Sequence, residues 1–155
     1  MCSEPLEVLD SFEYLLSSPP VIIRSPRNSS AVTRSIVFHR DEHYTETVYS
    51  PEGGLEALFE TAAQPLALAQ SNGCRRFLGD CRAMPFGGSA QDVRHLVTFI
   101  AASGIGPNDR EALIVPDGAD QAGNFRYFGE LCHQRGITVQ LFTTREQGLA
   151  WLLAS

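Results

Sequence analysis

The sequence contains no lysine, so all 12 of its basic residues are arginines. This absence removes every mechanism that needs a side-chain amine, including Schiff-base formation, the anchoring of pyridoxal phosphate and the lysine of a phosphate-binding loop. Several classes of enzyme are therefore excluded before any motif is considered.

Positive charge is scarce as a whole, because 18 acidic residues bring the formal net charge to −6. Nucleic acids and anionic membranes attract proteins through a positive field. We therefore expect neither a nucleic acid nor a membrane among the partners. No apolar stretch approaches the ~18 residues of a membrane span, and residues 1–16 lack the basic flank of a signal peptide.

Cysteines are few, and Cys2, Cys74, Cys81 and Cys132 form neither a CxxC pair nor a zinc-binding spacing. We expect Cys74 and Cys132 to be buried as small apolar residues. Cys81 lies at the end of a predicted strand and is the one thiol placed to act as a nucleophile. The pattern predicts a reduced, cytoplasmic protein without a cofactor.

The apolar content, 43% of 155 residues, is enough for one domain with its own core. Residues 1–34 are interpreted as an N-terminal arm. Within it, residues 5–16 have the spacing of a short amphipathic helix, and residues 17–34 are a linker rich in serine and proline. That helix either packs on its own domain, residues 35–155, or docks on a partner.

Strands and helices alternate from Ser35 onward. Residues 35–41 and 44–50 predict an antiparallel hairpin. Periodicity then predicts a helix at 54–73, a strand at 75–81, a helix at 90–103, a strand at 111–116, a helix at 124–136, a strand at 137–142 and a last helix with capping-box spacing between Thr143 and Glu146. The order ββαβαβαβα predicts a single α/β domain with a mixed, mostly parallel five-stranded sheet and flanking helices.

Two stretches resemble the STAS-like family, which includes the anti-sigma-factor antagonists. The closing GITVQLFTTREQGLAWLLAS is similar to the end of small bacterial members, and GCRRFLGDCRAM is similar to their central strand, which carries an aspartate near its end. The resemblance covers residues 35–155. It implies a STAS-like fold and a non-catalytic regulatory module that binds a protein partner. Independently of the resemblance, a homodimer is a further possibility.

Family antagonists are phosphorylated on a serine at the start of the helix after that strand, and Ser89 lies near that place. The family signature Asp-Ser-Ser-Gly is replaced here by Gly87-Gly88-Ser89-Ala90. Phosphate would add negative charge and block docking. The simpler interpretation is that Ser89 caps a helix, with Asp92 favourable to its dipole. Two glycines at a helix start also suit an anion.

The candidate residues for binding a partner or an anion are Asp80, Gly87, Gly88, Ser89 and Asp117, in the loops at 80–85 and 116–120 and the helix start at 86–95. No catalytic residue is predicted. An alternative function is a domain that binds a lipid or nucleotide at the carboxyl ends of the strands. A less favoured one is an enzyme that uses Cys81 or Asp80.

A metal site is the last possibility weighed, in the sequence HRDEH at residues 39–43. His39, Asp41, Glu42 and His43 are all ligand types, but a turn between the two histidines breaks their alignment. A solvated hairpin turn is the favoured interpretation, and no metal site is predicted.

Overall fold

The structure is a computed structural model, and it describes residues 22–23, 33–52, 55–84, 87–119 and 123–154. Most of the predicted arm, including its helix and Cys2, lies outside the described residues. The α/β domain that the sequence predicts is present, with its strands and helices in the predicted order.

Six strands form one sheet: β1 Ile22–Ile23, β2 Thr33–His39, β3 Tyr44–Tyr49, β4 Arg76–Asp80, β5 Arg110–Ile114 and β6 Thr138–Phe142. They lie side by side in the order of the sequence. β1, β2 and β3 are antiparallel neighbours, whereas β3, β4, β5 and β6 run parallel to one another. The five predicted strands are confirmed, and the short β1 extends the sheet beyond the predicted hairpin.

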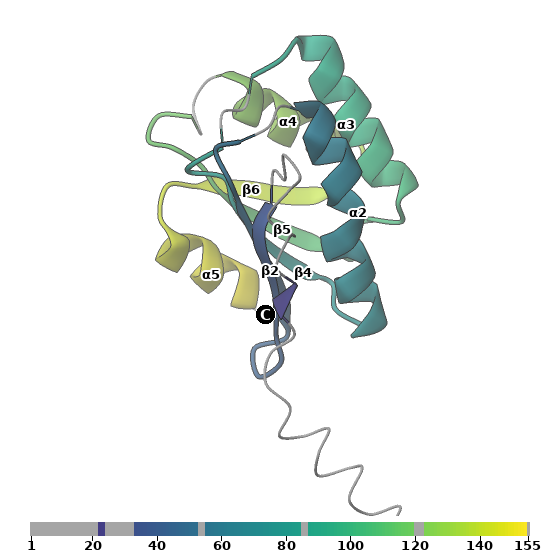
Figure 1. The fold of residues 1–155 in the computed structure, drawn as a ribbon, viewed down its shortest axis with the longest axis vertical. Coiled ribbons are helices and arrows are strands. Elements are labelled where there is room, and N and C mark those ends of the chain that lie inside the picture. Colours follow the sequence, from purple (N-terminus) through teal and green to yellow (C-terminus); the bar gives the residue numbers. More distant parts are fainter. Residues whose placement is uncertain (1–21, 24–32, 53–54, 85–86, 120–122, 155) are drawn as a thin grey trace, which may run out of the picture.

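The helices of the described chain are α2 Leu55–Ser71, α3 Ala90–Ala102, α4 Gly123–Gln134 and α5 Arg145–Leu153. α2, α3 and α4 each connect one parallel strand to the next, always in the same direction along the sheet. Crossovers of one hand and one direction place their helices on the same face. Figure 1 shows these three helices together on one face and α5 on the other.

Side chains alternate along each strand, so the core is divided between the two faces of the sheet. On the α5 face, Leu78 and Ile114 pack against Leu152. On the other face, Leu113 belongs to the larger cluster that includes Phe128 of α4. Both faces of the parallel strands are therefore covered, as expected for this type of sheet.

The helix ends agree with the sequence in most places. Gly73, with a φ of +61°, follows the last turn of α2. The cap of α5 differs: the hydroxyl of Thr144, not of the predicted Thr143, accepts a hydrogen bond from the amide of Gln147. A capping side chain reaches an amide two or three residues on, and Gln147 stands at that distance from Thr144. The predicted capping box at Thr143 and Glu146 is therefore wrong by one residue.

The carboxyl end of α5 is held by an arginine of the sheet. The guanidinium of Arg110 lies 4.3 Å from the centre of the Trp151 ring. It donates hydrogen bonds to the carbonyls of Trp151, at 2.8 Å, and Ala154, at 2.6 Å. It thus satisfies carbonyls that have no partner within a helix at its carboxyl end.

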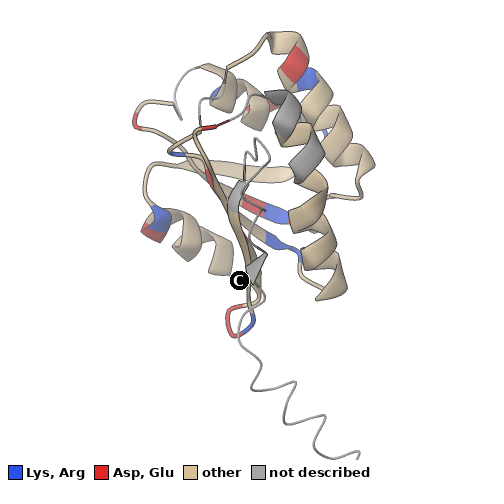
Figure 2. Cartoon of the chain, viewed as in Figure 1, with Lys and Arg blue, Asp and Glu red and all other residues tan. Residues whose placement is uncertain are grey.

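Charges of both signs are interspersed over the described elements, including a basic and an acidic residue side by side at the start of α5 (Figure 2). Among the described helices, none combines the length and apolar character needed to cross a membrane.

Candidate functional site

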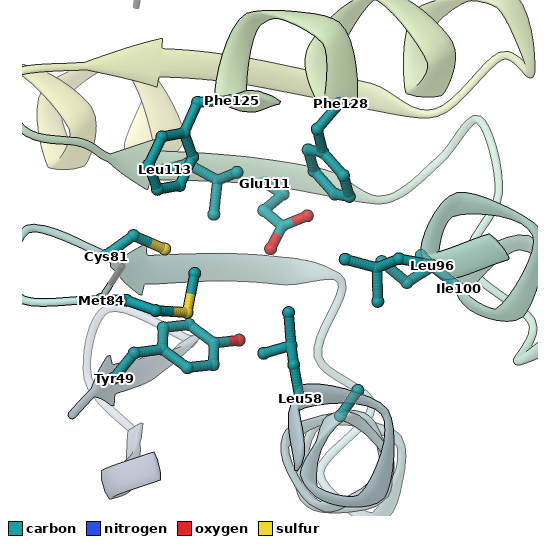
Figure 3. A pocket seen from close by; sticks show the side chains of 11 residues that line it. Tyr49, Leu58, Cys81, Met84, Leu96, Ile100, Glu111, Leu113, Phe125 and Phe128 are labelled. Atoms are coloured by element: carbon teal, nitrogen blue, oxygen red, sulfur yellow. The ribbon is translucent and has the colours of Figure 1, made fainter. Parts of the chain in front are cut away.

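Two small cavities lie between the sheet and the helices α2, α3 and α4. Each has a volume of about 50 Å³. They share part of their lining, namely Tyr49, Ala62, Ile100 and Glu111. Most of the remaining lining is apolar, and Figure 3 shows how side chains from the strands and all three helices converge on the first cavity.

Gly79 of β4 leaves room for these cavities. An ideal Cβ on Gly79 would lie 2.7 Å from Leu113 Cδ2, 3.5 Å from the ring of Tyr49 and 3.9 Å from Glu111 Oε1. Tyr49 belongs to β3 and Glu111 to β5, the strands on either side of β4. Because the residue between them has no side chain, these two polar side chains approach the same point above the sheet.

Glu111 carries the only charge among the described residues that line the cavities. It shares a face of β5 with Leu113, two residues on, and so points toward the helices. The residue is half-buried, but the surroundings of its carboxyl are apolar, and this burial raises the pKa of Glu111 from 4.5 to about 7. No hydrogen bond or ion pair reaches this carboxyl from the described residues.

Two hydroxyl groups complete the polar lining. Tyr49 borders both cavities, and Thr47, which is 4% exposed, borders the second. Burial, with smaller effects from Cys81 and Glu111, raises the pKa of Tyr49 well above 10.0, so its hydroxyl keeps its proton at neutral pH. Figure 3 shows the Tyr49 hydroxyl and the Glu111 carboxyl turned into the same pocket.

Cys81 also borders the first cavity, but its environment does not activate the thiol. Burial raises the pKa of Cys81 well above 9.0, and the nearby carboxylates of Glu111 and Asp80 raise it further. A thiol is nucleophilic only as the thiolate. Cys74 and Cys132 are buried as predicted. Neither they nor Cys81 forms a disulfide bond.

The structure places Asp80 at the end of β4, in an ion pair. The Asp80 carboxylate accepts hydrogen bonds from Arg82 Nη2, at 2.7 Å, and Arg82 Nε, at 3.0 Å. These bonds hold the pKa of Asp80 below its ordinary value. Any ligand or partner of Asp80 would have to compete with this internal pair.

Ser89 caps α3, which confirms the capping interpretation. Its hydroxyl accepts a hydrogen bond from the Asp92 amide, at 3.2 Å, and the Asp92 carboxylate accepts one from the Ser89 amide, at 2.7 Å. This is a complete capping box. The Gly88 carbonyl accepts a hydrogen bond from Asn124 Nδ2, at 3.2 Å, which joins the starts of α3 and α4.

The structure brings only some of the five predicted binding residues together. Gly87, Gly88 and Ser89 are consecutive and exposed, and Asp117 is exposed in the loop after β5. Asp80 ends β4, and Asp117 lies in the loop after the neighbouring parallel strand β5, so both lie at the same edge of the sheet. None of the five lines either cavity.

The histidines of residues 39–43 have separate partners. His39 Nε2 lies 2.8 Å from Glu46 Oε2, and His43 Nε2 lies 3.3 Å from the carbonyl of Gly73. Across the described ranges, no three histidine, cysteine, aspartate or glutamate side chains are grouped so as to hold a metal ion.

Sequence reasoning missed the cavity residues Glu111, Tyr49 and Thr47. The prediction of a strand at 111–116 gives no role to its first residue, Glu111. A usable signal was present: in a strand buried on both faces, a glutamate that shares a face with Leu113 and Val115 cannot simply point to solvent.

Comparisons with known proteins identify no relative of this chain. No family model matches the chain, and no curated protein or solved structure matches it either. The STAS-like resemblance therefore stays a prediction.

Proposed function

We propose that this chain is a small-molecule-binding domain whose ligand occupies the two cavities beneath α2, α3 and α4. The observation that carries the proposal is the Glu111 carboxyl, which faces apolar surroundings without a described partner. A carboxyl that is surrounded by apolar side chains and lacks hydrogen bonds lowers the stability of the empty protein, by several kcal/mol when it is ionised. A ligand that donates a hydrogen bond would offset this cost.

The composition of the site supports this proposal. Ligand pockets are mostly apolar and contain a few polar groups that fix the orientation of the ligand. Here Glu111, Tyr49 and Thr47 are the polar groups, and leucine, isoleucine, methionine and phenylalanine side chains supply the apolar lining.

Size and charge narrow the ligand classes that the sequence suggests. A nucleotide phosphate or the carboxylate of a fatty acid would meet Glu111, and the described lining contains no arginine or histidine to balance it. Each cavity has a volume of about 50 Å³, and one water molecule needs about 10–15 Å³ of such space, so each cavity holds only a few non-hydrogen atoms. A small molecule fits these limits better than a lipid or a nucleotide.

A matched pair of substitutions in α2 tests the proposal. Ala62 lines both cavities, whereas Ala63 is exposed. A fragment library is screened by the shift in melting temperature and by ligand-observed NMR. We expect a set of fragments to bind the unchanged protein and the Ala63→Leu variant but not Ala62→Leu, whose larger side chain fills the cavities. Fragments that bind all three proteins equally, or none of them, would contradict the proposal.

A regulatory module that docks a protein partner is the second candidate. It is favoured by the exposure of Gly87, Gly88, Ser89 and Asp117, which lie in the segments that follow β4 and β5. Phosphate on Ser89 would face the carboxylate of Asp92 and disrupt the cap of α3. A cytoplasmic location is part of both candidates.

A further inference from the structure

Among the residues that line the two cavities, those with side-chain oxygen atoms are Glu111, Tyr49 and Thr47. All three accept hydrogen bonds, and only the carboxylate of Glu111 carries a charge. The described residues of both linings include no cationic side chain. The site therefore favours a ligand that brings both hydrogen-bond donors and positive charge.

The rest of the lining suits a short hydrocarbon group. Phe125 and Phe128 of α4, Leu58 of α2 and Leu96 of α3 surround the first cavity opposite the sheet (Figure 3). Aromatic faces also attract cations, so these side chains are compatible with a nearby positive charge.

We propose that the ligand is a small primary alkylammonium ion, with its charged group against Glu111 and its alkyl chain among the apolar side chains of the first cavity. An ammonium group has three N–H donors, and Glu111, Tyr49 and Thr47 offer three acceptors around the second cavity. The small volumes limit the alkyl chain to a few carbons. The inference rests on the proposed small-molecule-binding function.

The protonation of the site agrees with this ligand. The pKa of Glu111 is about 7 in the empty protein, and a bound cation would favour its ionised form. The other ionisable groups that act on or respond to Glu111 are Tyr49, Cys81 and Cys132, whose pKa values are all raised by burial. These three stay neutral between about pH 5 and 8, so affinity for the cation should rise with the ionisation of Glu111 alone.

Three probes of similar size test the inference: propylamine, 1-propanol and propionate. Each is titrated at about pH 8 by two-dimensional NMR into the unchanged protein and two variants, Glu111→Gln and Glu130→Gln. Glu130 is an exposed residue of α4 that pairs with Arg126, so Glu130→Gln removes one negative charge away from the cavities. We expect propylamine to bind at least roughly tenfold more tightly than 1-propanol, as a charge-assisted hydrogen bond allows.

The preference for propylamine should persist in Glu130→Gln and fall to roughly twofold or less in Glu111→Gln. Equal binding of propylamine and 1-propanol to the unchanged protein, tighter binding of propionate, or a preference that survives in Glu111→Gln would overturn the alkylammonium inference. In these cases the small-molecule-binding function still stands if the fragments distinguish Ala62→Leu from Ala63→Leu. If no probe and no fragment binds, both proposals fail.

Discussion

Glu46 and Arg145 lie 99 residues apart in the chain and form a two-pronged ion pair, with Arg145 Nε 2.8 Å from Glu46 Oε1 and Arg145 Nη2 2.9 Å from Glu46 Oε2. Arg145 also donates a hydrogen bond to the hydroxyl of Tyr44, at 3.0 Å. His39 binds the same carboxylate from the end of β2. The start of α5 is thus attached to β3 by a charged network at the edge of the core.

This network predicts a loss of stability in acid. Burial acts to raise the pKa of Glu46, but the hydrogen bonds from Arg145 and His39 outweigh it and hold the pKa below 4.5. Such a carboxylate stabilises the fold above its ordinary pKa, and the contribution is lost as the pH falls through the lower folded value. We expect Glu46→Gln to reduce the free energy of unfolding by about 1–2 kcal/mol at neutral pH.

Urea denaturation across the acid range measures this effect. The difference between the unchanged protein and Glu46→Gln should shrink as the pH falls below 4.5. The exposed Glu130, which pairs with Arg126 four residues before it, serves as the control, and Glu130→Gln should cost less than about 0.5 kcal/mol. A difference for Glu46→Gln that is independent of pH would contradict the prediction.

Glu111 should have the opposite dependence on pH. The folded protein keeps a proton on Glu111 up to about pH 7, whereas the unfolded chain releases it near 4.5. The free energy of unfolding therefore falls as the pH rises between these values, by about 3 kcal/mol from this group. We expect Glu111→Gln, which cannot ionise, to be more stable than the unchanged protein at about pH 8 and to lose this advantage at about pH 5.

Denaturation curves of the two proteins at both pH values check this result. The two proteins differ only at residue 111, so the contributions of the other ionisable groups cancel in the difference. Tyr49, Cys81 and Cys132 keep their protons throughout, because burial raises the pKa of each. Parallel pH profiles for the unchanged protein and Glu111→Gln would show that the carboxyl is ionised at an ordinary pKa.

Local patterns made the elements of this fold predictable. Val93, Leu96 and Val97 recur at helical spacing, and all three are buried along α3. The cap formed by Ser89 and Asp92 depends on residues three positions apart, so the sequence predicts it equally well. Such features need no knowledge of which strands become neighbours.

The cavities could not be predicted in the same way, because they depend on the register of three strands. Tyr49 and Glu111 approach each other only because β4 lies between their strands with Gly79 at the level of the gap. A glycine inside a strand does suggest close approach of another group. It does not say which group approaches. The distance between side chains on different strands depends on strand order and register, which no single stretch of the sequence specifies.

The capping box of Ser89 predicts a measurable loss when the hydroxyl is removed. Ser89→Ala should lower the free energy of unfolding by about 1 kcal/mol, because the amide of Asp92 loses its acceptor. Ser89→Asp should cost less, since an aspartate can also cap, although it places a second carboxylate beside Asp92. The exposed Gln91 in the same turn gives the control, and Gln91→Ala should be neutral within about 0.5 kcal/mol.

The role of Ser89 in binding is separated from its role in the cap by the same variants. If the serine only caps the helix, each variant should lose affinity for a protein partner only to the extent that it loses free energy of unfolding. This should hold for Ser89→Ala and Ser89→Asp alike. A loss of binding confined to Ser89→Asp, with stability retained, would instead support a phosphorylation switch.

Two glycines inside helices should respond to alanine in opposite directions. A Cβ on Gly148 of α5 would collide with Ile114 Cδ1 of β5 and lie 3.4 Å from the ring of Phe142, so α5 approaches the sheet closely at this residue. A Cβ on Gly129 of α4 would meet only Leu141 Cγ, at 4.0 Å, an ordinary contact. We expect Gly148→Ala to destabilise the protein by about 1–3 kcal/mol through overpacking.

Gly129→Ala should instead stabilise the protein by about 0.5–1 kcal/mol, because alanine loses less backbone freedom than glycine when a helix forms. Thermal and urea unfolding of the two variants against the unchanged protein provide the comparison. The helical preference for alanine is common to both positions, so the difference in sign isolates the contact between α5 and β5. If Gly148→Ala were as stable as Gly129→Ala, α5 would have to shift away from the sheet at no cost, and the tight packing between Gly148 and Ile114 would not contribute to the stability of the fold.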